Sequence, residues 1–433
     1  MREARTVRKD EPVQSTSEPL ARRLGLGDAV LIGLGSMIGA GVFAAFGPAA
    51  AAAGSGLLIG LVLAAAIAYC NAVASAQLAA VYPVSGGTYS YGRERLGEWF
   101  GFTAGWGFVV GKTASCAAMA LTFASYAVPS GWLQRVIAVV AVLALAALNY
   151  RGITRTAQLT RILVLVSLLA LAVLVVGIGV GGDATTSKLG LPSALWTGGP
   201  YGIAQSAGLL FFAIAGYARI ATLGEEVRDP ARTIPRAIPV ALAITVVVYL
   251  VVGVAALAAA GPDLLASSPA PLATAVRAAG AEHLVVIVRI GGAVAALGAL
   301  LSLIAGVGRT SLAMARNRDL PRWLSAVHPR FQVPHHAEIA LAVVVSVAVA
   351  VVDLREVIGF SSFGVLIYYA IANASAFTQP VAERRWPRAL NVIGCIGCLV
   401  LVATLPWQSV AAGIGMFAVG LVGRLIVLSR RTG

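Results

Sequence analysis

Two glycine-containing segments interrupt apolar stretches of this chain, and their backbone could bind a small polar molecule. The first reads GSMIGAG at 35–41 and the second FAIAGYA at 212–218. Where a helix unwinds, its upstream half ends in free carbonyl groups and its downstream half begins with free N–H groups. Broken backbone at membrane depth is tolerated only where it lines a cavity in the protein. The alternative for the first segment is a contact between helices through small residues, but the two segments together favour a binding site.

The free N–H groups of the first segment would suit a carboxylate. We expect the carboxylate to lie on the amides of Ala40 and Gly41, with that of Gly39 beside them, at the positive end of a helix dipole. Glycines permit this approach because they carry no side chain. The first segment therefore supplies the anion-binding half of the predicted site.

The free carbonyl groups would suit an ammonium group. We expect it to meet the carbonyls of Met37, Phe212 and Ala215, with Gly216 giving access to the backbone. A zwitterion, with one carboxylate and one ammonium group, matches both halves of the site.

Lys112 is a charged residue in the middle of an apolar span. It lies 17 residues from both Arg95 and Pro129, which is more than about 20 Å along a helix at 1.5 Å per residue. A charge at the bilayer centre costs on the order of 3 kcal/mol, so such a residue is a functional hypothesis by default. Lys112 must face the bundle or a cavity. It is either a titrating cation that couples transport or a permanently satisfied group that donates to broken-helix carbonyls.

Other residues near the two segments have open roles. Arg219 lies six residues before Glu225, so it could extend toward the cytoplasm, pair with Glu225 or Glu226, or act as a gate. Three residues between 112 and 120 are predicted to line the pocket for the ligand's side chain: Ser115, Ala118 and Met119.

The composition indicates which elements hold these residues. The 433 residues are 59% hydrophobic and 12% charged, against about 25% charged in an ordinary soluble domain. Windows of about 20 apolar residues predict an all-α polytopic membrane protein with about twelve spans. These spans are 26–48, 55–79, 100–128, 133–150, 158–181, 201–223, 237–260, 284–308, 337–353, 356–378, 390–406 and 408–428.

The two interrupted segments fall in the first and sixth spans, which is the arrangement expected of five-plus-five inverted repeats around a central site. We predict one transporter domain over 25–430. Its repeats would cover 26–181 and 201–378, with two extra helices at 390–428. Residues 1–24 are polar and charged and are predicted to be a disordered cytoplasmic tail.

The positive charge is explained by topology. With a cytoplasmic N-terminus and twelve spans, 25 of the 32 basic residues fall on predicted cytoplasmic segments, as the positive-inside rule requires. The net charge of +14 therefore predicts a multi-pass cell-membrane protein with both termini in the cytoplasm, surrounded by the lipid bilayer, and not a nucleic-acid-binding surface. No obligate protein partner is evident.

Several chemistries have no support in the sequence. Cys395 and Cys398 form a CxxC pair without a partnering cysteine or histidine pair, so we predict no metal site. No Walker loop is present, no charged ring suggests a channel, and no clustered constellation suggests an enzyme. We predict no cofactor and no catalytic residues.

Four motifs resemble the amino acid–polyamine–organocation superfamily. They are GSMIGAGVF at 35–43, PVSGGTYSY at 83–91, ALTFASY at 120–126, and the stretch 211–236, which ends in EEVRDPARTIPR. The resemblance covers about residues 24–430. It implies the LeuT-type fold, with helices one and six broken, and transport of amino acids or amines by alternating access. It also implies substrate binding at the two interrupted segments and an aromatic gate at Phe212.

Two departures from the family pattern bear on substrate and coupling. Relatives that carry cations often have an acidic residue where this chain has Ala218, so neutral amino acids are favoured over cationic ones. Several relatives have a lysine where this chain has Ser167, so that lysine's coupling role cannot be carried over. Lys112 favours a proton as the coupling ion. The alternative is a cationic amino acid or polyamine antiporter or exchanger.

Overall fold

The computed structural model describes residues 24–82, 86–129, 131–151, 156–181, 185–189, 193–221 and 227–432. These residues form a helical protein without strands, apart from one isolated bridge between Leu24 and Val227. The long helices are α4 (Leu57–Val81), α6 (Glu98–Ala127), α7 (Trp132–Tyr150), α8 (Thr156–Gly181), α9 (Gly199–Ile214), α11 (Pro230–Ser267), α13 (Val285–Arg316), α14 (His335–Val351), α15 (Leu354–Phe377), α16 (Arg388–Thr404) and α17 (Trp407–Thr432).

The chain also contains shorter helices and 3-10 turns. The helices are α1 (Leu26–Met37), α2 (Ala40–Ala44), α3 (Phe46–Ala53), α5 (Thr88–Leu96), α10 (Ala218–Ala221) and α12 (Pro271–Ala278). The turns are η1 (Gly54–Gly56), η2 (Thr186–Leu189), η3 (Ser193–Trp196), η4 (Ala215–Tyr217), η5 (Glu282–Leu284), η6 (Arg322–Ser325) and η7 (Val381–Glu383).

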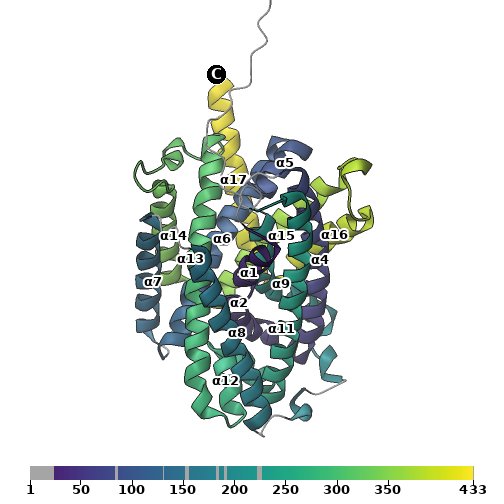
Figure 1. Ribbon diagram of the computed structural model, residues 1–433, viewed down its shortest axis with the longest axis vertical. Coiled ribbons are helices and arrows are strands. Elements are labelled where there is room, and N and C mark those ends of the chain that lie inside the picture. Colours follow the sequence, from purple (N-terminus) through teal and green to yellow (C-terminus); the bar gives the residue numbers. More distant parts are fainter. Residues whose placement is uncertain are drawn as a thin grey trace, which may run out of the picture.

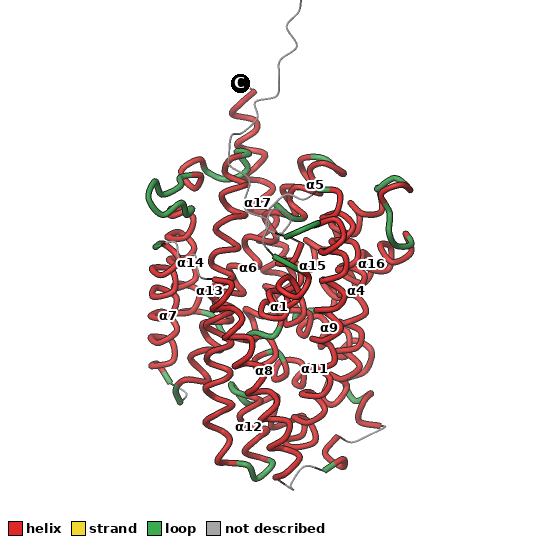
Figure 2. The backbone as a smooth tube through the Cα atoms, viewed as in Figure 1, coloured by secondary structure: helices red, strands yellow, loops and turns green. Residues whose placement is uncertain are grey.

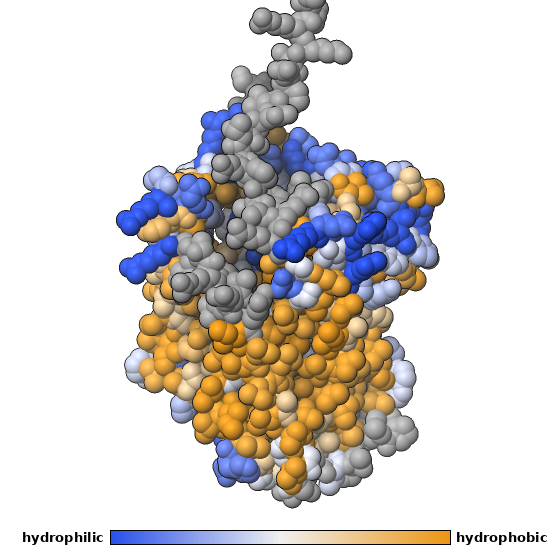
Figure 3. Space-filling model, in the orientation of Figure 1, coloured by the Kyte–Doolittle hydropathy of each residue, from blue (hydrophilic) through white to orange (hydrophobic). Residues whose placement is uncertain are grey.

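The helices have the length and composition of membrane spans. Ten helical stretches of the described chain are long and apolar enough to cross a bilayer, and α14 and α16 are shorter apolar helices of 17 residues each. Apolar side chains cover the flank of the molecule, and hydrophilic ones gather at the end nearest the C-terminus (Figure 3). The polytopic helical class is thus confirmed, whereas the count of twelve spans and the repeat boundaries remain predictions. Residues 1–23 of the predicted tail lie outside the described residues.

Burial separates central from peripheral helices. The most apolar window of α15 is 83% buried, whereas those of α7 and α17 are 22% and 17% buried. Helices α1 and α2 lie near the middle of the bundle, and α7 and α14 lie together at one side (Figures 1 and 2). Residues on α1, α6, α9 and α13 are therefore well placed to surround a common centre.

Both glycine-containing segments interrupt their helices. Helix α1 ends at Met37, Ile38 leaves helical geometry with ψ of 58°, and α2 begins at Ala40. In the second segment α9 ends at Ile214, and η4 then leads into α10 at Ala218. The regular α-helix is therefore interrupted twice, at the positions that the glycines indicate.

Candidate functional site

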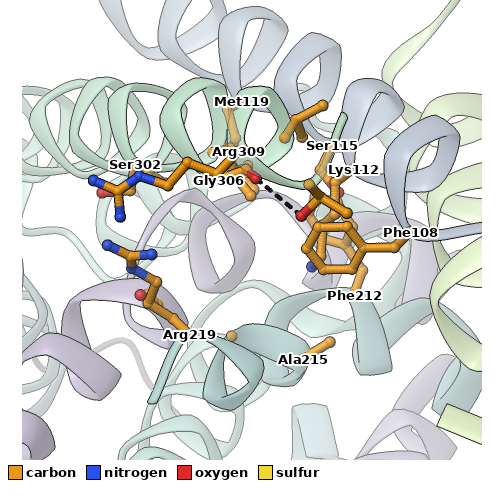
Figure 4. A pocket seen from close by; sticks show the side chains of 16 residues that line it. Phe108, Lys112, Ser115, Met119, Phe212, Ala215, Arg219, Ser302, Gly306 and Arg309 are labelled. Carbon is orange, nitrogen blue, oxygen red and sulfur yellow. Dashed lines mark hydrogen bonds between the residues drawn. The ribbon is translucent and has the colours of Figure 1, made fainter. Parts of the chain in front are cut away.

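A cavity of about 100 Å³ lies beside the two interrupted segments. Figure 4 shows side chains converging from α6, the α9–α10 break and α13, and Ser36 of α1 lines the cavity as well. Its lining comprises Ser36, Phe108, Lys112, Ser115, Met119, Phe212, Ala215, Gly216, Arg219, Ala299, Ser302, Leu303, Gly306, Val307, Arg309 and Thr310. A water needs roughly 10–15 Å³ of such space, so the cavity has room for a small organic molecule.

One face of α6 supplies four lining residues. Phe108, Lys112, Ser115 and Met119 are separated by four, three and four positions, the spacing that places side chains on a single helix face. Ala118 is fully buried but is not among the lining residues, because one position along a helix turns a side chain by about 100°. Ser115 is held in place by Ser361 of α15, whose hydroxyl lies 2.6 Å away.

The second interrupted segment faces the cavity directly. Phe212, Ala215, Gly216 and Arg219 all line it, and Phe212 is 7% exposed. The α9–η4–α10 break therefore brings the three predicted binding residues of this segment to the cavity together with Arg219.

The first interrupted segment meets the cavity only through Ser36. Met37, Gly39, Ala40 and Gly41 are buried behind it and do not line it. Two of them are held against other helices. A Cβ on Gly39 would lie 2.8 Å from the methyl group of Ala299, and one on Gly41 would lie 2.6 Å from the Cα of Ala213. Both glycines thus permit close packing of helices, and the predicted contact of the 39–41 amides with a carboxylate stays a prediction.

The two breaks also touch each other through Gly216. A Cβ there would lie 2.2 Å from the carbonyl oxygen of Ser36 and 2.7 Å from the Met37 nitrogen. Real Cβ atoms essentially never approach other atoms this closely, so only glycine lets η4 lie on the end of α1. Gly216 therefore lies within the second break and also permits this break to pack against the first.

Buried tyrosines satisfy the carbonyl groups that the breaks release. The Tyr249 hydroxyl of α11 lies 2.6 Å from the Met37 carbonyl oxygen and 3.2 Å from that of Ala213. Tyr369 of α15 donates to the carbonyl oxygen of Ala215 at 3.1 Å. Two of the three carbonyls predicted to receive an ammonium group thus already accept a hydrogen bond.

The charged groups in the cavity are basic. Lys112, Arg219 and Arg309 line it, and none of the described lining residues is acidic. Lys112 is only 8% exposed and makes no hydrogen bond or ion pair with another described residue. The guanidinium groups of Arg219 and Arg309 face each other at one side of the cavity, away from Lys112 (Figure 4). Glu225 and Glu226, the predicted partners of Arg219, lie outside the described residues.

Ser167 lies in a second, much smaller cavity. This space of about 10 Å³ is enclosed by α1, α8 and α13, and its lining includes Gly35, Ile38 and Ser302. It is about the size of one water. The Ser167 hydroxyl donates to the Leu163 carbonyl oxygen at 2.7 Å. Within the described chain, no group of three or more His, Cys, Asp or Glu residues could hold a metal ion.

Helix α13 is the wall that the sequence analysis missed. It contributes seven lining residues, among them Ser302, Gly306 and Thr310, each four positions from the next. This stripe of small and hydroxyl-bearing residues along one face of an apolar helix was a readable signal. The sequence signal for the buried tyrosines was weaker: it was only a phenol in the middle of an apolar span.

Comparison with known proteins places the chain in a family. The amino acid permease family matches residues 24–423. An uncharacterized transporter of Mycobacterium tuberculosis is 59% identical over 96% of this chain and 93% of its own length. The branched-chain amino acid permease of Bacillus subtilis is 25% identical over 94% of this chain and 93% of its own length. The chloroplastic cationic amino acid transporter 7 of Arabidopsis thaliana is 26% identical over 92% of this chain and 73% of its own length. On the extent of these matches, the chain belongs to the amino acid permease family of the amino acid–polyamine–organocation superfamily.

Proposed function

We propose that this protein is a secondary transporter that moves neutral amino acids across the cytoplasmic membrane by alternating access. The observation that carries the proposal is the cavity where α1, α6, α10 and α13 meet at the two helix breaks. A discontinuous helix offers backbone dipoles and free hydrogen-bonding groups to a polar substrate at membrane depth. The family membership supports transport of an amino acid.

The charge of the cavity supports a neutral substrate over a cationic one. Relatives of this chain carry branched-chain or cationic amino acids by name. A lysine or arginine side chain entering this cavity would meet three basic residues and no described acidic lining residue. Like charges brought together in a medium of low dielectric repel strongly. Ala218 supports the same choice, because cation-carrying relatives often have a carboxylate at that position.

Lys112 supports a coupling role for protons. It is buried in the cavity wall without a hydrogen bond to another described residue. Desolvation disfavours the charged form of such an amine. We propose that Lys112 takes up and releases a proton as the cavity changes its access. Both termini would lie in the cytoplasm, as the distribution of basic residues indicates.

A thermal-shift screen tests the substrate class. The purified protein in detergent is heated with each proteinogenic amino acid and with common diamines at two pH values. A ligand that binds only the folded state stabilises it, by about 2.7 kcal/mol at a concentration of one hundred times its Kd. The melting temperature rises as a result. We expect shifts with a few neutral amino acids. Shifts with arginine, lysine or diamines alone would contradict the proposed substrate class.

A further inference from the structure

A third cavity, larger than the two described above, lies at the end of the molecule nearest the C-terminus. It measures about 650 Å³ and is bounded by the start of α6, the segment that follows α13 and the last turns of α17. Cavities of roughly 300–1,000 Å³ are typical of small-molecule sites. It is separate from the central cavity, with which it shares no lining residue.

Arg424 forms the buried part of this cavity. Its side chain is 5% exposed and contacts Asp319 at 3.0 Å and Glu98 at 3.3 Å. Its guanidinium also lies 4.7 Å from the centre of the Phe102 ring. Its Nε atom is buried and has no hydrogen-bond partner. A buried donor without an acceptor is costly, so Arg424 is the incompletely satisfied member of this charged cluster.

Asp319 is fully engaged by its own neighbours. One carboxylate oxygen accepts from the Tyr89 hydroxyl at 2.8 Å and from Arg93 at 2.9 Å, and the other contacts Arg424. Burial and the adjacent carboxylate raise the pKa of the Tyr89 hydroxyl, which therefore stays a donor. Arg93 and Arg424 are balanced by Glu98 and Asp319. Arg318 and Arg322 also line the cavity, so its described lining holds four arginines and two carboxylates.

Arg318 adopts a backbone conformation that arginine seldom takes. Its φ is 63°, at the position following α13 where a hydrogen bond from the Asp319 amide to the Met314 carbonyl closes a Schellman motif. Glycine is the usual residue there, and a residue with a Cβ is disfavoured by about 1–2 kcal/mol. Strain of this kind is found where a side chain serves a function. Here it puts an exposed guanidinium on the rim of the cavity.

The third wall of the cavity is apolar and faces outward. Val419 and Val427 of α17 line it and are 70% and 45% exposed. Trp106 also lines the cavity, and its Nε1 donates to the Met416 carbonyl oxygen at 2.9 Å. A site with arginines at the level where helices end and with apolar walls along a span has the two-part chemistry of a phospholipid.

We propose that this cavity binds an anionic phospholipid, with the phosphate on Arg318, Arg322 and Arg424 and an acyl chain along α17. Arginine suits phosphate because its planar fork donates two parallel hydrogen bonds. The lipid would hold α17, which is otherwise mostly exposed, against α6 and the end of α13.

Binding can be measured through the melting temperature of the purified protein in detergent. The additives are dioleoyl phosphatidylglycerol, dioleoyl phosphatidylcholine and inorganic phosphate. The variants are Arg322→Gln and Arg318→Gly, with Arg385→Gln as a control because Arg385 is an exposed arginine outside the cavity. Arg318→Gly suits its positive φ, and the lipid-induced rise of each variant is compared with that variant's own melting temperature without lipid.

We expect phosphatidylglycerol to raise the melting temperature of the wild type and of Arg385→Gln by several degrees. The rise should fall by at least half in Arg322→Gln and in Arg318→Gly, and phosphatidylcholine should have little effect. An equal rise in all variants, or with both lipids, would overturn the proposal. The same rise with inorganic phosphate alone would also overturn it by identifying a site for a free anion.

Discussion

Tyr249 joins the two helix breaks through a single hydroxyl group. It lies within hydrogen-bonding distance of carbonyl oxygens from both interrupted segments, those of Met37 and Ala213. Its ring is fully buried, so no water is available to replace those bonds. At the residue scale the geometry of the site depends on side chains that do not line the cavity.

Replacing Tyr249 with phenylalanine should therefore weaken both the fold and transport. A buried carbonyl left without its donor costs about 1–3 kcal/mol. We expect a lower melting temperature and a reduced rate of amino acid uptake into proteoliposomes. Tyr201→Phe is the control, because Tyr201 is 58% exposed, and it should change neither. Full activity in Tyr249→Phe would show that the breaks keep their geometry without this hydroxyl.

Lys112 is the residue on which proton coupling depends in our proposal. If it carries the coupled proton, Lys112→Gln and Lys112→Ala should lose the pH dependence of uptake, whatever rate remains. Lys188→Gln, at an exposed lysine outside the cavity, should keep it. Uptake is measured in proteoliposomes over a range of external pH. If both Lys112 variants transport with an unaltered pH profile, the residue has a structural role only.

Gly306 offers a test of where the substrate's side chain lies. It lines the cavity, and a Cβ built on it would meet no other atom within 4 Å. Gly306→Ala should fold at least as well as the wild type, because alanine is favoured over glycine in a helix by about 1 kcal/mol. Gly306→Val should shift selectivity toward smaller amino acids. The measurement is competition by a size series of amino acids, and an unchanged order of competition in Gly306→Val would contradict this placement of the pocket.

At the scale of elements, the central contact is η4 lying on the end of α1. Only the missing side chain of Gly216 allows this approach, because a Cβ would lie 2.2 Å from the Ser36 carbonyl oxygen. The obstructing atom belongs to the backbone, which cannot move aside as a flexible side chain can. The two breaks must therefore separate if Gly216 gains a methyl group.

Gly216→Ala should accordingly abolish transport and destabilise the protein. Overpacking of a tight core typically costs about 1–3 kcal/mol. Gly415→Ala is the matched control, since a Cβ at Gly415 would have open space around it, and it should be tolerated. Melting temperature and uptake are both measured. Normal uptake by Gly216→Ala would mean that the breaks need not touch during the transport cycle.

The sequence predicted the elements better than it predicted the faces that they present. The breaks at 35–41 and 212–218 were readable because glycines within an apolar run are a local signal. Which residues line the cavity depends on how each helix is rotated about its axis, and that is set by packing against other helices. Ser115 and Met119 therefore line the cavity while Ala118 does not. The α13 wall carried a signal in its stripe of small and hydroxyl-bearing residues, and Tyr249 in its phenol within an apolar span, but only the tertiary contacts show which groups each one meets.

At the scale of the whole molecule, a bundle with an apolar flank is polar at the end that holds the C-terminus (Figure 3). The positive-inside rule predicts that the C-terminus, and therefore this end, lies in the cytoplasm. Helices that end on the cytoplasmic side would then line both the central cavity and the proposed lipid site. The same charge pattern would orient the protein and supply its contacts with anionic lipid.

This topology predicts the location of the C-terminus. A fluorescent protein that matures only in the cytoplasm should be bright when fused after Gly433. A reporter enzyme that is active only outside the cytoplasm should be inactive at that position. The opposite pair of results would contradict the predicted orientation. The end that holds the C-terminus would then lie at the other face of the membrane.

The most direct test of the account is uptake of radiolabelled amino acids by proteoliposomes with an imposed pH gradient, comparing wild type with Gly216→Ala and Gly306→Val. We predict uptake of a few neutral amino acids by the wild type, loss of uptake in Gly216→Ala, and a narrower size range in Gly306→Val. Uptake of arginine, lysine or diamines to the exclusion of neutral amino acids would contradict the account. Selectivity unchanged in both variants would contradict it as well, because the substrate would then bind away from the two helix breaks.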